Sequence, residues 1–233
     1  MKILSIDSSA LTASVALCDD QKVLAQYTLN NGNTHSETLL PMIESVLSFF
    51  GITAKDIDLF AVSAGPGSFT GVRIGASTLK GLAFAWNKPC CEVSTLEALA
   101  YNLRLHKGLI CPVMNARRSQ VYTALFRSDG INLERLMPDS ALSIAELDEM
   151  LCQYGEEICL CGDGYDITAA GFEKTSLCFV PEEMRAQSAV SVAQVALKNY
   201  KNELFCSDTE LGVNYLRPSQ AERERAEKLE NQK

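Results

Sequence analysis

Two short polar stretches have residue types that could hold a phosphate. Asp7-Ser8-Ser9 follows an apolar run, and its carboxylate, hydroxyls and turn amides could hold a metal-bound phosphate. Gly162-Asp163-Gly164 could also approach a phosphate closely, because glycine has no side chain to block the backbone. The same residue types are the usual turn formers. The sequence therefore leaves a phosphate site and a purely structural turn as alternatives for both stretches.

Other arrangements that support catalysis are missing from the sequence. Its two histidines, His35 and His106, are too far apart for a helical metal pair. Neither a Gly-x-Ser-x-Gly nucleophile motif nor a P-loop occurs. Arg117 and Arg118 could bind an anion, but they stand where a turn needs polar residues anyway. We therefore expect no catalytic residue and no metal site, and a scaffold rather than a peptidase or other catalyst.

Composition excludes several classes of protein. The 233 residues carry a formal net charge of −8, whereas independent nucleic-acid binding needs a basic face. An RNA-related role would therefore need a partner that supplies that face. No signal-like segment precedes Asp7 and no charge-free run reaches membrane-spanning length. The nine scattered cysteines are typical of reduced, mostly buried thiols, and we expect a cytoplasmic protein away from membranes.

The first half of the sequence predicts a strand meander followed by alternating helices and strands. Three strands joined by tight turns should form the meander, and β-α-β crossovers should extend it into a mixed sheet. Capping boxes predict two of the helices. The predicted strands are residues 2–7, 12–18, 23–29, 58–64 and 89–93, and the predicted helices begin near residues 35, 69 and 95, the last ending near 106.

Two of these helices carry more apolar surface than one buried stripe requires. On the helix over 69–86, Val72, Ala76, Leu79, Ala83 and Trp86 share a core-facing stripe, yet the opposite side is also largely apolar. The helix that begins near residue 35 shows the same excess. Large exposed apolar surfaces usually mark interfaces. We therefore predict that one face of each helix packs on its own sheet and another binds a second protein.

The second half predicts a smaller version of the same unit. Its boundary with the first falls near residues 106–108, which gives an N-terminal lobe over 1–106 and a reduced C-terminal lobe over 107–233. The charged stretch 221–233 should form a solvated helix or a frayed tail. The predicted strands are residues 109–114, 120–126, 132–136, 157–161 and 177–180, and the predicted helices cover 144–154 and 188–204.

Ordered motifs along nearly the whole chain resemble the TsaB (YeaZ-like) family. The string Gly65 to Gly75 is the most specific of them, and Asn115 departs from the family, which usually has aspartate there. The other motifs are Asp7-Ser8-Ser9, Ser14 to Leu17, His35-Ser36-Glu37, Leu39-Leu40-Pro41, Lys80 to Ala83, Ala116-Arg117-Arg118 with Val121-Tyr122, Gly162-Asp163-Gly164 and Tyr215 to Pro218.

The resemblance implies an actin-like, Hsp70-like ATPase fold of two lobes, each with a mixed sheet flanked by helices. It also implies a role in placing threonylcarbamoyl on N6 of adenosine 37 in tRNAs that read ANN codons. There, a metal-binding TsaD-like paralogue catalyses the transfer and a TsaE-like ATPase supports turnover. The TsaB-like subunit pairs with the TsaD-like one through helices of its first lobe, and it meets tRNA only within the complex.

Combined with the apolar excess, this resemblance gives a set of expected partner-binding residues. They are His35, Glu37, Leu39, Leu40, Ile43, Leu47, Gly71, Arg73, Ile74, Gly75, Thr78 and Gly81. We expect no cofactor of the chain's own, although ATP or ADP could bind at the contact with partner subunits. When the partner is absent, two copies of the chain could also pair through the same helices.

A small-molecule kinase or ATPase of the same fold is the alternative function. Asp7 would then hold a metal ion, and the Gly162-Asp163-Gly164 loop would bind phosphate, since such enzymes act mainly by positioning and electrostatics. Tight binding of Mg-ATP by the isolated chain would favour this alternative over the partner subunit.

Overall fold

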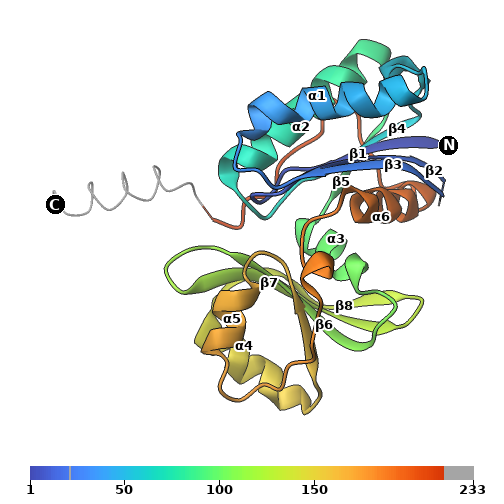
Figure 1. Cartoon of the computed structure of the whole chain (residues 1–233). Coiled ribbons are helices and arrows are strands. Elements are labelled where there is room, and N and C mark those ends of the chain that lie inside the picture. The colour runs from blue at the N-terminus through green and yellow to red at the C-terminus, as the bar shows by residue number, and fades with distance from the viewer. Residues whose placement is uncertain (21, 218–233) are drawn as a thin grey trace, which may run out of the picture.

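The first sheet has the strand order β3-β2-β1-β4-β5. Neighbours β1, β2 and β3 pair antiparallel, whereas β4 and β5 add in parallel after helical crossovers. A computed structural model describes residues 1–20 and 22–217, and Figure 1 shows this sheet at the centre of the first lobe. The strands are β1 (Lys2–Asp7), β2 (Ala13–Asp19), β3 (Lys22–Leu29), β4 (Leu59–Ser63) and β5 (Cys90–Val93).

Helices cover both faces of this sheet (Figure 1). Successive strand side chains point to opposite faces, so β1 sends Leu4 and Ile6 to one core and Ile3 to the other. The first core lies under α1 (His35–Phe49) and α2 (Phe69–Trp86), which pack side by side. The second core lies under α6 (Ala189–Lys201).

The position of α6 contradicts the predicted boundary between two consecutive lobes at residues 106–108. Helix α6 is the last described helix and follows the second lobe in the sequence, but its buried side chains pack on β1, β2, β4 and β5 of the first sheet. The segment after it stays with the first lobe, since Cys206 and Cys90 exchange backbone hydrogen bonds of 2.8 Å. A C-terminal lobe over 107–233 is therefore wrong, because the chain returns to the first lobe at α6.

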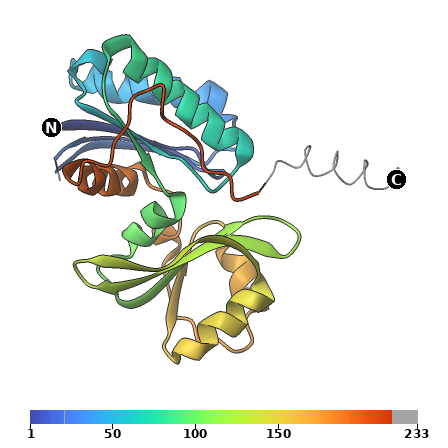
Figure 2. The ribbon, with the colours of Figure 1, turned by 180° about the vertical axis from the view of Figure 1, so that it is seen from behind.

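The second lobe is built on a sheet of order β8-β7-β6-β9. β6, β7 and β8 pair antiparallel, and β9 adds parallel to β6. Helix α3 packs on one face of this sheet, and α4 and α5 lie on the other (Figures 1 and 2). The elements are α3 (Thr95–Asn102), β6 (Lys107–Asn115), β7 (Gln120–Asp129), β8 (Leu133–Ser143), α4 (Ile144–Leu151), β9 (Ile158–Cys161) and α5 (Tyr165–Gly171).

Several local expectations differ from the structure. Residues 177–180 form one bridge, Ile158 to Leu177, rather than a strand, and α5 was not predicted. Trp86 is 48% exposed and leaves the expected core stripe, because it is the last residue of α2. The stretch 221–233 lies outside the described residues. Short 3-10 turns occupy Ala54–Asp56, Cys152–Tyr154 and Glu182–Met184.

The expectation of nine reduced thiols is also corrected. Cys159 of β9 and Cys178 are joined by a disulfide, and the other seven cysteines are free. The two residues are brought together because residues 176–178 run beside β9, which the sequence spacing of 19 does not reveal.

No described helix is both long and apolar enough to span a membrane.

Candidate functional site

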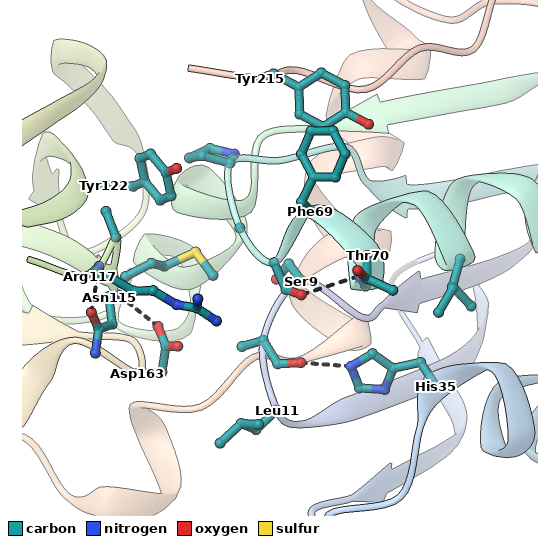
Figure 3. Close-up of a pocket in the computed structure, with 18 of the residues that line it drawn as sticks. Ser9, Leu11, His35, Phe69, Thr70, Asn115, Arg117, Tyr122, Asp163 and Tyr215 are labelled. Carbon is teal, nitrogen blue, oxygen red and sulfur yellow. Dashed lines mark hydrogen bonds between the residues drawn. The ribbon is translucent and has the colours of Figure 1, made fainter. Parts of the chain in front are cut away.

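A cleft of about 670 Å³ lies where loops of the two lobes face each other. Its walls come from the turn after β1, the start of α1, the start of α2, the β6–β7 turn and residues 214–217. Figure 3 shows side chains from these separate segments around one space. Long-range folding therefore brings together motifs that are more than one hundred residues apart.

Asp7 does not line this cleft but is fully buried below it. Its Oδ1 accepts hydrogen bonds from the backbone N–H of Ser9 (3.0 Å) and the hydroxyl of Ser9 (2.6 Å), and its Oδ2 accepts one from Ser63. Burial raises the pKa of Asp7, and these hydrogen bonds oppose the rise. Both carboxylate oxygens are thus used inside the lobe, so the expected metal-holding role of Asp7 finds no support.

Ser8 and Ser9 are held against the start of α2. The hydroxyl of Ser8 donates to the carbonyl of Gly71 (2.9 Å), and the N–H of Ser68 donates to the carbonyl of Ser9 (2.7 Å). A Cβ on Gly71 would lie 2.1 Å from the carbonyl oxygen of Ser8, and one on Gly75 would lie 2.4 Å from its hydroxyl. The small residues of α2 therefore admit the chain's own β1–β2 turn.

The Gly162-Asp163-Gly164 loop also packs on its own lobe. Gly162 has φ +103°, and a Cβ there would lie 2.2 Å from the carbonyl oxygen of Val113 on β6. Of the three residues, only Asp163 lines the cleft; its Oδ1 accepts a hydrogen bond from the N–H of Asn115 (3.3 Å). Burial raises the pKa of Asp163, and nearby Asp7 adds to the rise. The glycines are needed for close packing here, which explains them without a phosphate.

The β6–β7 turn has an unusual backbone. Arg117, Arg118 and Ser119 all have positive φ, from +54° to +64°, a region that side chains other than glycine seldom adopt. The side-chain oxygen of Asn115 accepts a hydrogen bond from the N–H of Arg117 (2.8 Å). Arg117 lines the cleft beside Tyr122, and Arg118 does not. The turn thus aims a single arginine at the space between the lobes.

His35 fixes the first turn of α1 to the turn after β1. Its Nε2 lies 2.7 Å from the carbonyl oxygen of Ala10 (Figure 3), so this nitrogen is the donor. Its Nδ1 is buried and has no partner within the described residues. The expected role of His35 at an interface is untested, and its ring is half-buried against its own chain.

Two aromatic residues from separate motifs stack over the start of α2, a contact that the sequence did not predict. Phe69 and Tyr215 stack with ring centroids 4.5 Å apart, and the guanidinium of Arg73 lies 3.8 Å from the centroid of Phe69. The Nε of Arg73 donates to the hydroxyl of Tyr215 (2.6 Å). Tyr215 belonged to a recognised motif, but its place beside α2 follows only from the return of the chain after α6 (Figure 3).

The cleft is lined by hydroxyl, amide and aromatic groups together with the charged side chains of Arg117, Asp163 and Arg217. The Nε2 of His35 donates to the backbone carbonyl of Ala10, whereas in a serine-type triad this nitrogen accepts a hydrogen bond from the nucleophilic hydroxyl.

The outer face of α1 and α2 is the second candidate site. On α1, Leu40 is 47% exposed and Glu37 is exposed beside it. On α2, Ile74 and Thr78 are half-buried and Gly81 is exposed, with open space where its Cβ would be. The two helices lie side by side on the outside of the first lobe (Figure 1), and Ile74 also lines the cleft.

Part of the expected partner set lies elsewhere. Leu39, Ile43 and Leu47 are at most 7% exposed and belong to the core under α1. Gly71 and Gly75 are buried against Ser8. These five residues cannot contact a partner in this fold, because the sheet and the β1–β2 turn already cover them. Arg73 stays exposed but is tied to Tyr215.

Comparisons with known proteins agree with this architecture. The family profile described as TsaD, tRNA N6-adenosine threonylcarbamoyltransferase, matches residues 22–220. The tRNA threonylcarbamoyladenosine biosynthesis protein TsaB of Bacillus subtilis is 40% identical over 151 residues, which are 65% of this chain and 66% of the relative. The TsaB of Buchnera aphidicola is 32% identical over 166 residues, 70% of this chain and 79% of the relative.

Other relatives match over shorter stretches. The TsaB of Escherichia coli is 37% identical over 131 residues, 55% of this chain and 56% of the relative. The chain thus spans between about half and two thirds of the length of the Escherichia coli and Bacillus subtilis relatives. The solved structure of YeaZ from Pseudomonas aeruginosa aligns with TM-score 0.76 and 22% identity, covering 92% of this chain and 99% of that one.

Two lobes with helix-flanked mixed sheets, joined through α3, define the actin-like class that includes the Hsp70-type ATPases. Within that class, the profile match over most of the chain and the identities of 32–40% decide the family. The chain belongs to the TsaB (YeaZ-like) family.

Proposed function

We propose that this chain is a non-catalytic partner subunit in the N6-threonylcarbamoylation of adenosine 37 in tRNAs that read ANN codons. It pairs with a TsaD-like catalytic subunit through the outer face of α1 and α2. The names of the relatives and the description of the matched family support the pathway. The surface itself supports the mode of pairing.

The exposed apolar surface across α1 and α2 is the observation that carries this proposal. Leu40 is 47% exposed, and Ile74 and Thr78 are only half-buried on the neighbouring helix. Gly81 has no atom within 4 Å of its Cβ position, which leaves room for a second helix to approach. Burial of such apolar side chains releases about 25 cal/mol per Å², and a partner's helices would supply that burial.

The absence of a catalytic role is supported by the surroundings of Asp7 and Gly162. The carboxylate of Asp7 accepts hydrogen bonds from the hydroxyls of Ser9 and Ser63, and the backbone of Gly162 packs against that of Val113. A kinase of this fold would need both at the cleft, so the kinase alternative loses support. The net charge of −8 also favours contact with tRNA through the complex rather than directly.

The remaining partners belong to the same proposal. A TsaE-like ATPase joins the assembly, and ATP or ADP binds at the contact between subunits rather than to this chain alone. When the TsaD-like subunit is missing, two copies of this chain pair through the same face, because an apolar surface can be self-complementary about a two-fold axis.

Charged substitutions on this face test the proposal. Leu40→Glu and Ile74→Glu should weaken binding to the purified TsaD-like subunit at least about 30-fold, which corresponds to about 2 kcal/mol. Calorimetric titration measures the affinity. The matched control is Ile131→Glu, at an 82% exposed position between β7 and β8, which should bind normally. Pairing at full strength by both α1–α2 variants would disprove the placement.

A second titration separates the partner subunit from the kinase alternative. The isolated chain should bind Mg-ATP only weakly, and Asp7→Ala should not change that. Tight binding by the isolated chain that is lost in Asp7→Ala would favour the kinase instead.

A further inference from the structure

Three potential metal ligands meet beside the sheet of the second lobe. His106, Cys159 and Cys178 each offer one ligand atom, and these atoms all lie within 4.8 Å of one another. They come from three separate segments: the connection from α3 to β6, strand β9, and the chain between α5 and α6. The group lies outside the cleft and outside the α1–α2 face, and neither proposal above uses it.

The backbone holds each of these segments in place independently of the sulfur atoms. The N–H of His106 donates to the carbonyl of Leu103 (2.8 Å), and the hydroxyl of Ser128 donates to the carbonyl of Arg104. The N–H of Cys178 donates to the carbonyl of Ile158 (3.1 Å). Cys159 is 3% exposed within β9. The three ligands are therefore preorganised by the sheet and its connections.

We propose that Cys159, Cys178 and His106 form a zinc-type metal site when the two cysteines are reduced, and that the disulfide is its oxidised, metal-free alternative. Two thiolates and one imidazole are ligands that Zn²⁺ prefers, at about 2.3 Å and about 2.0 Å respectively. Tetrahedral ligand atoms then lie about 3.3–3.8 Å apart, so small side-chain rotations suffice. A water molecule completes the fourth position, since exposed His106 opens the site to solvent.

Reduction converts the disulfide form into the metal-binding dithiol form. A thiol reductant gives two electrons and two protons to the Cys159–Cys178 bond, and two reductant thiols become one disulfide. One Zn²⁺ then replaces the two thiol protons, which are released to solvent. In the reverse direction a small-molecule disulfide takes two electrons from the two thiolates and two protons from solvent and becomes two thiols. The Cys159–Cys178 bond re-forms and Zn²⁺ is released, because a disulfide sulfur is no longer a thiolate ligand.

The position of the site gives it a structural consequence. His106 lies on the connection from α3 to β6 within the second lobe, and Cys178 lies on the segment that leads back to α6 in the first lobe. A metal ion bound by both would join the α3–β6 connection to the segment that leads back to the first lobe. The disulfide joins Cys178 only to β9 and does not include His106.

Metal titration of the full chain in two redox states tests this site. Thiol counts after denaturation define the states: seven for the oxidised chain and nine for the reduced chain. The reduced chain should bind one Zn²⁺, measured by competition with a chromophoric chelator. Co²⁺ in its place should show a thiolate charge-transfer band and the visible bands of a tetrahedral site. The oxidised chain should bind at least about 100-fold more weakly.

Single variants assign the ligands. Cys178→Ser and His106→Gln should each weaken binding by the reduced chain at least about 100-fold, and both positions are less buried than Cys159. Cys152→Ser is the matched control, since it removes another partly exposed thiol outside the group. Equal binding by the oxidised and reduced chains, or unchanged binding in Cys178→Ser and His106→Gln, would overturn the proposal.

Discussion

Asp7 has the chemistry of a metal ligand but the surroundings of a structural residue. Its carboxylate accepts hydrogen bonds from Ser9 and Ser63 at the point where β1, β4 and the turn after β1 meet. A buried carboxylate costs free energy unless it is hydrogen-bonded, so the serines stabilise it. The residue therefore organises the turn that α2 packs against.

The raised pKa of Asp7 gives a prediction at this scale. Because burial lifts its folded-state pKa above the ordinary 3.8, the folded chain keeps a proton that the unfolded chain has lost. Folding stability should therefore fall as the pH rises from about 4 through the folded pKa, by up to about 1.4 kcal/mol per pH unit. In Asp7→Asn this group does not titrate, so its contribution to the slope disappears.

Urea unfolding of both proteins between pH 4 and pH 8 measures this effect. The free energy of unfolding of Asp7→Asn minus that of the unaltered chain should rise with pH, on top of a constant offset from the changed hydrogen bonds. A difference that stays constant or falls across this range would contradict a raised pKa for Asp7.

At the scale of elements, α2 uses its small residues on two sides for different purposes. Gly71 and Gly75 face the β1–β2 turn, where any side chain would collide with Ser8. Gly81 faces outward, where a side chain would meet nothing. One helix thus combines close packing inside its lobe with an open surface outside it.

Two alanine substitutions separate these purposes. Gly71→Ala should lower the free energy of unfolding by about 1–3 kcal/mol, because a backbone carbonyl must move to admit the Cβ. Gly81→Ala should raise it by up to about 1 kcal/mol, through better helix propensity. Urea midpoints of the isolated chain check both. Similar effects at the two positions would show that Gly71 is not closely packed.

At the scale of the whole molecule, the first lobe needs α6, which follows the second lobe in the sequence. Without α6, the face of the first sheet that carries Ile3, Leu59 and Ala61 would lie open to water. The side-chain hydroxyl of Ser5 also donates to the carbonyl of Ala189 (2.7 Å). The two lobes are therefore interleaved along the chain rather than consecutive.

Truncation tests this interdependence. A chain ending at residue 187 should lose cooperative thermal unfolding and aggregate, because it lacks the helix that covers one face of the first sheet. A chain ending at residue 217 retains all the contacts described above and is the control. Near-ultraviolet circular dichroism and thermal scans measure the difference. A cooperative transition at an unchanged midpoint in the shorter chain would contradict the role of α6.

The sequence by itself determined most elements and the family. Apolar spacing and helix-start residues are short-range signals, so β1, α1, α2 and α4 fall close to their predicted bounds. The capping box forms at Ser143 of α4, but Thr34 makes no side-chain cap to α1. The long motif from Gly65 to Gly75 identified the family, which the comparisons support. The apolar excess of α1 and α2 predicted an outer surface on these helices, but five residues of the predicted set are buried in the lobe.

Only the tertiary structure decided which face of each apolar helix is buried and which is exposed to solvent. The spacing of Leu39, Leu40 and Ile43 cannot tell which apolar residues face the sheet and which face solvent, because the excess apolar surface extends around the helix. The structure buries Leu39 and Ile43 and leaves Leu40 exposed. The return of α6 and the meeting of Cys159, Cys178 and His106 depend on contacts between distant segments, which local sequence patterns do not encode.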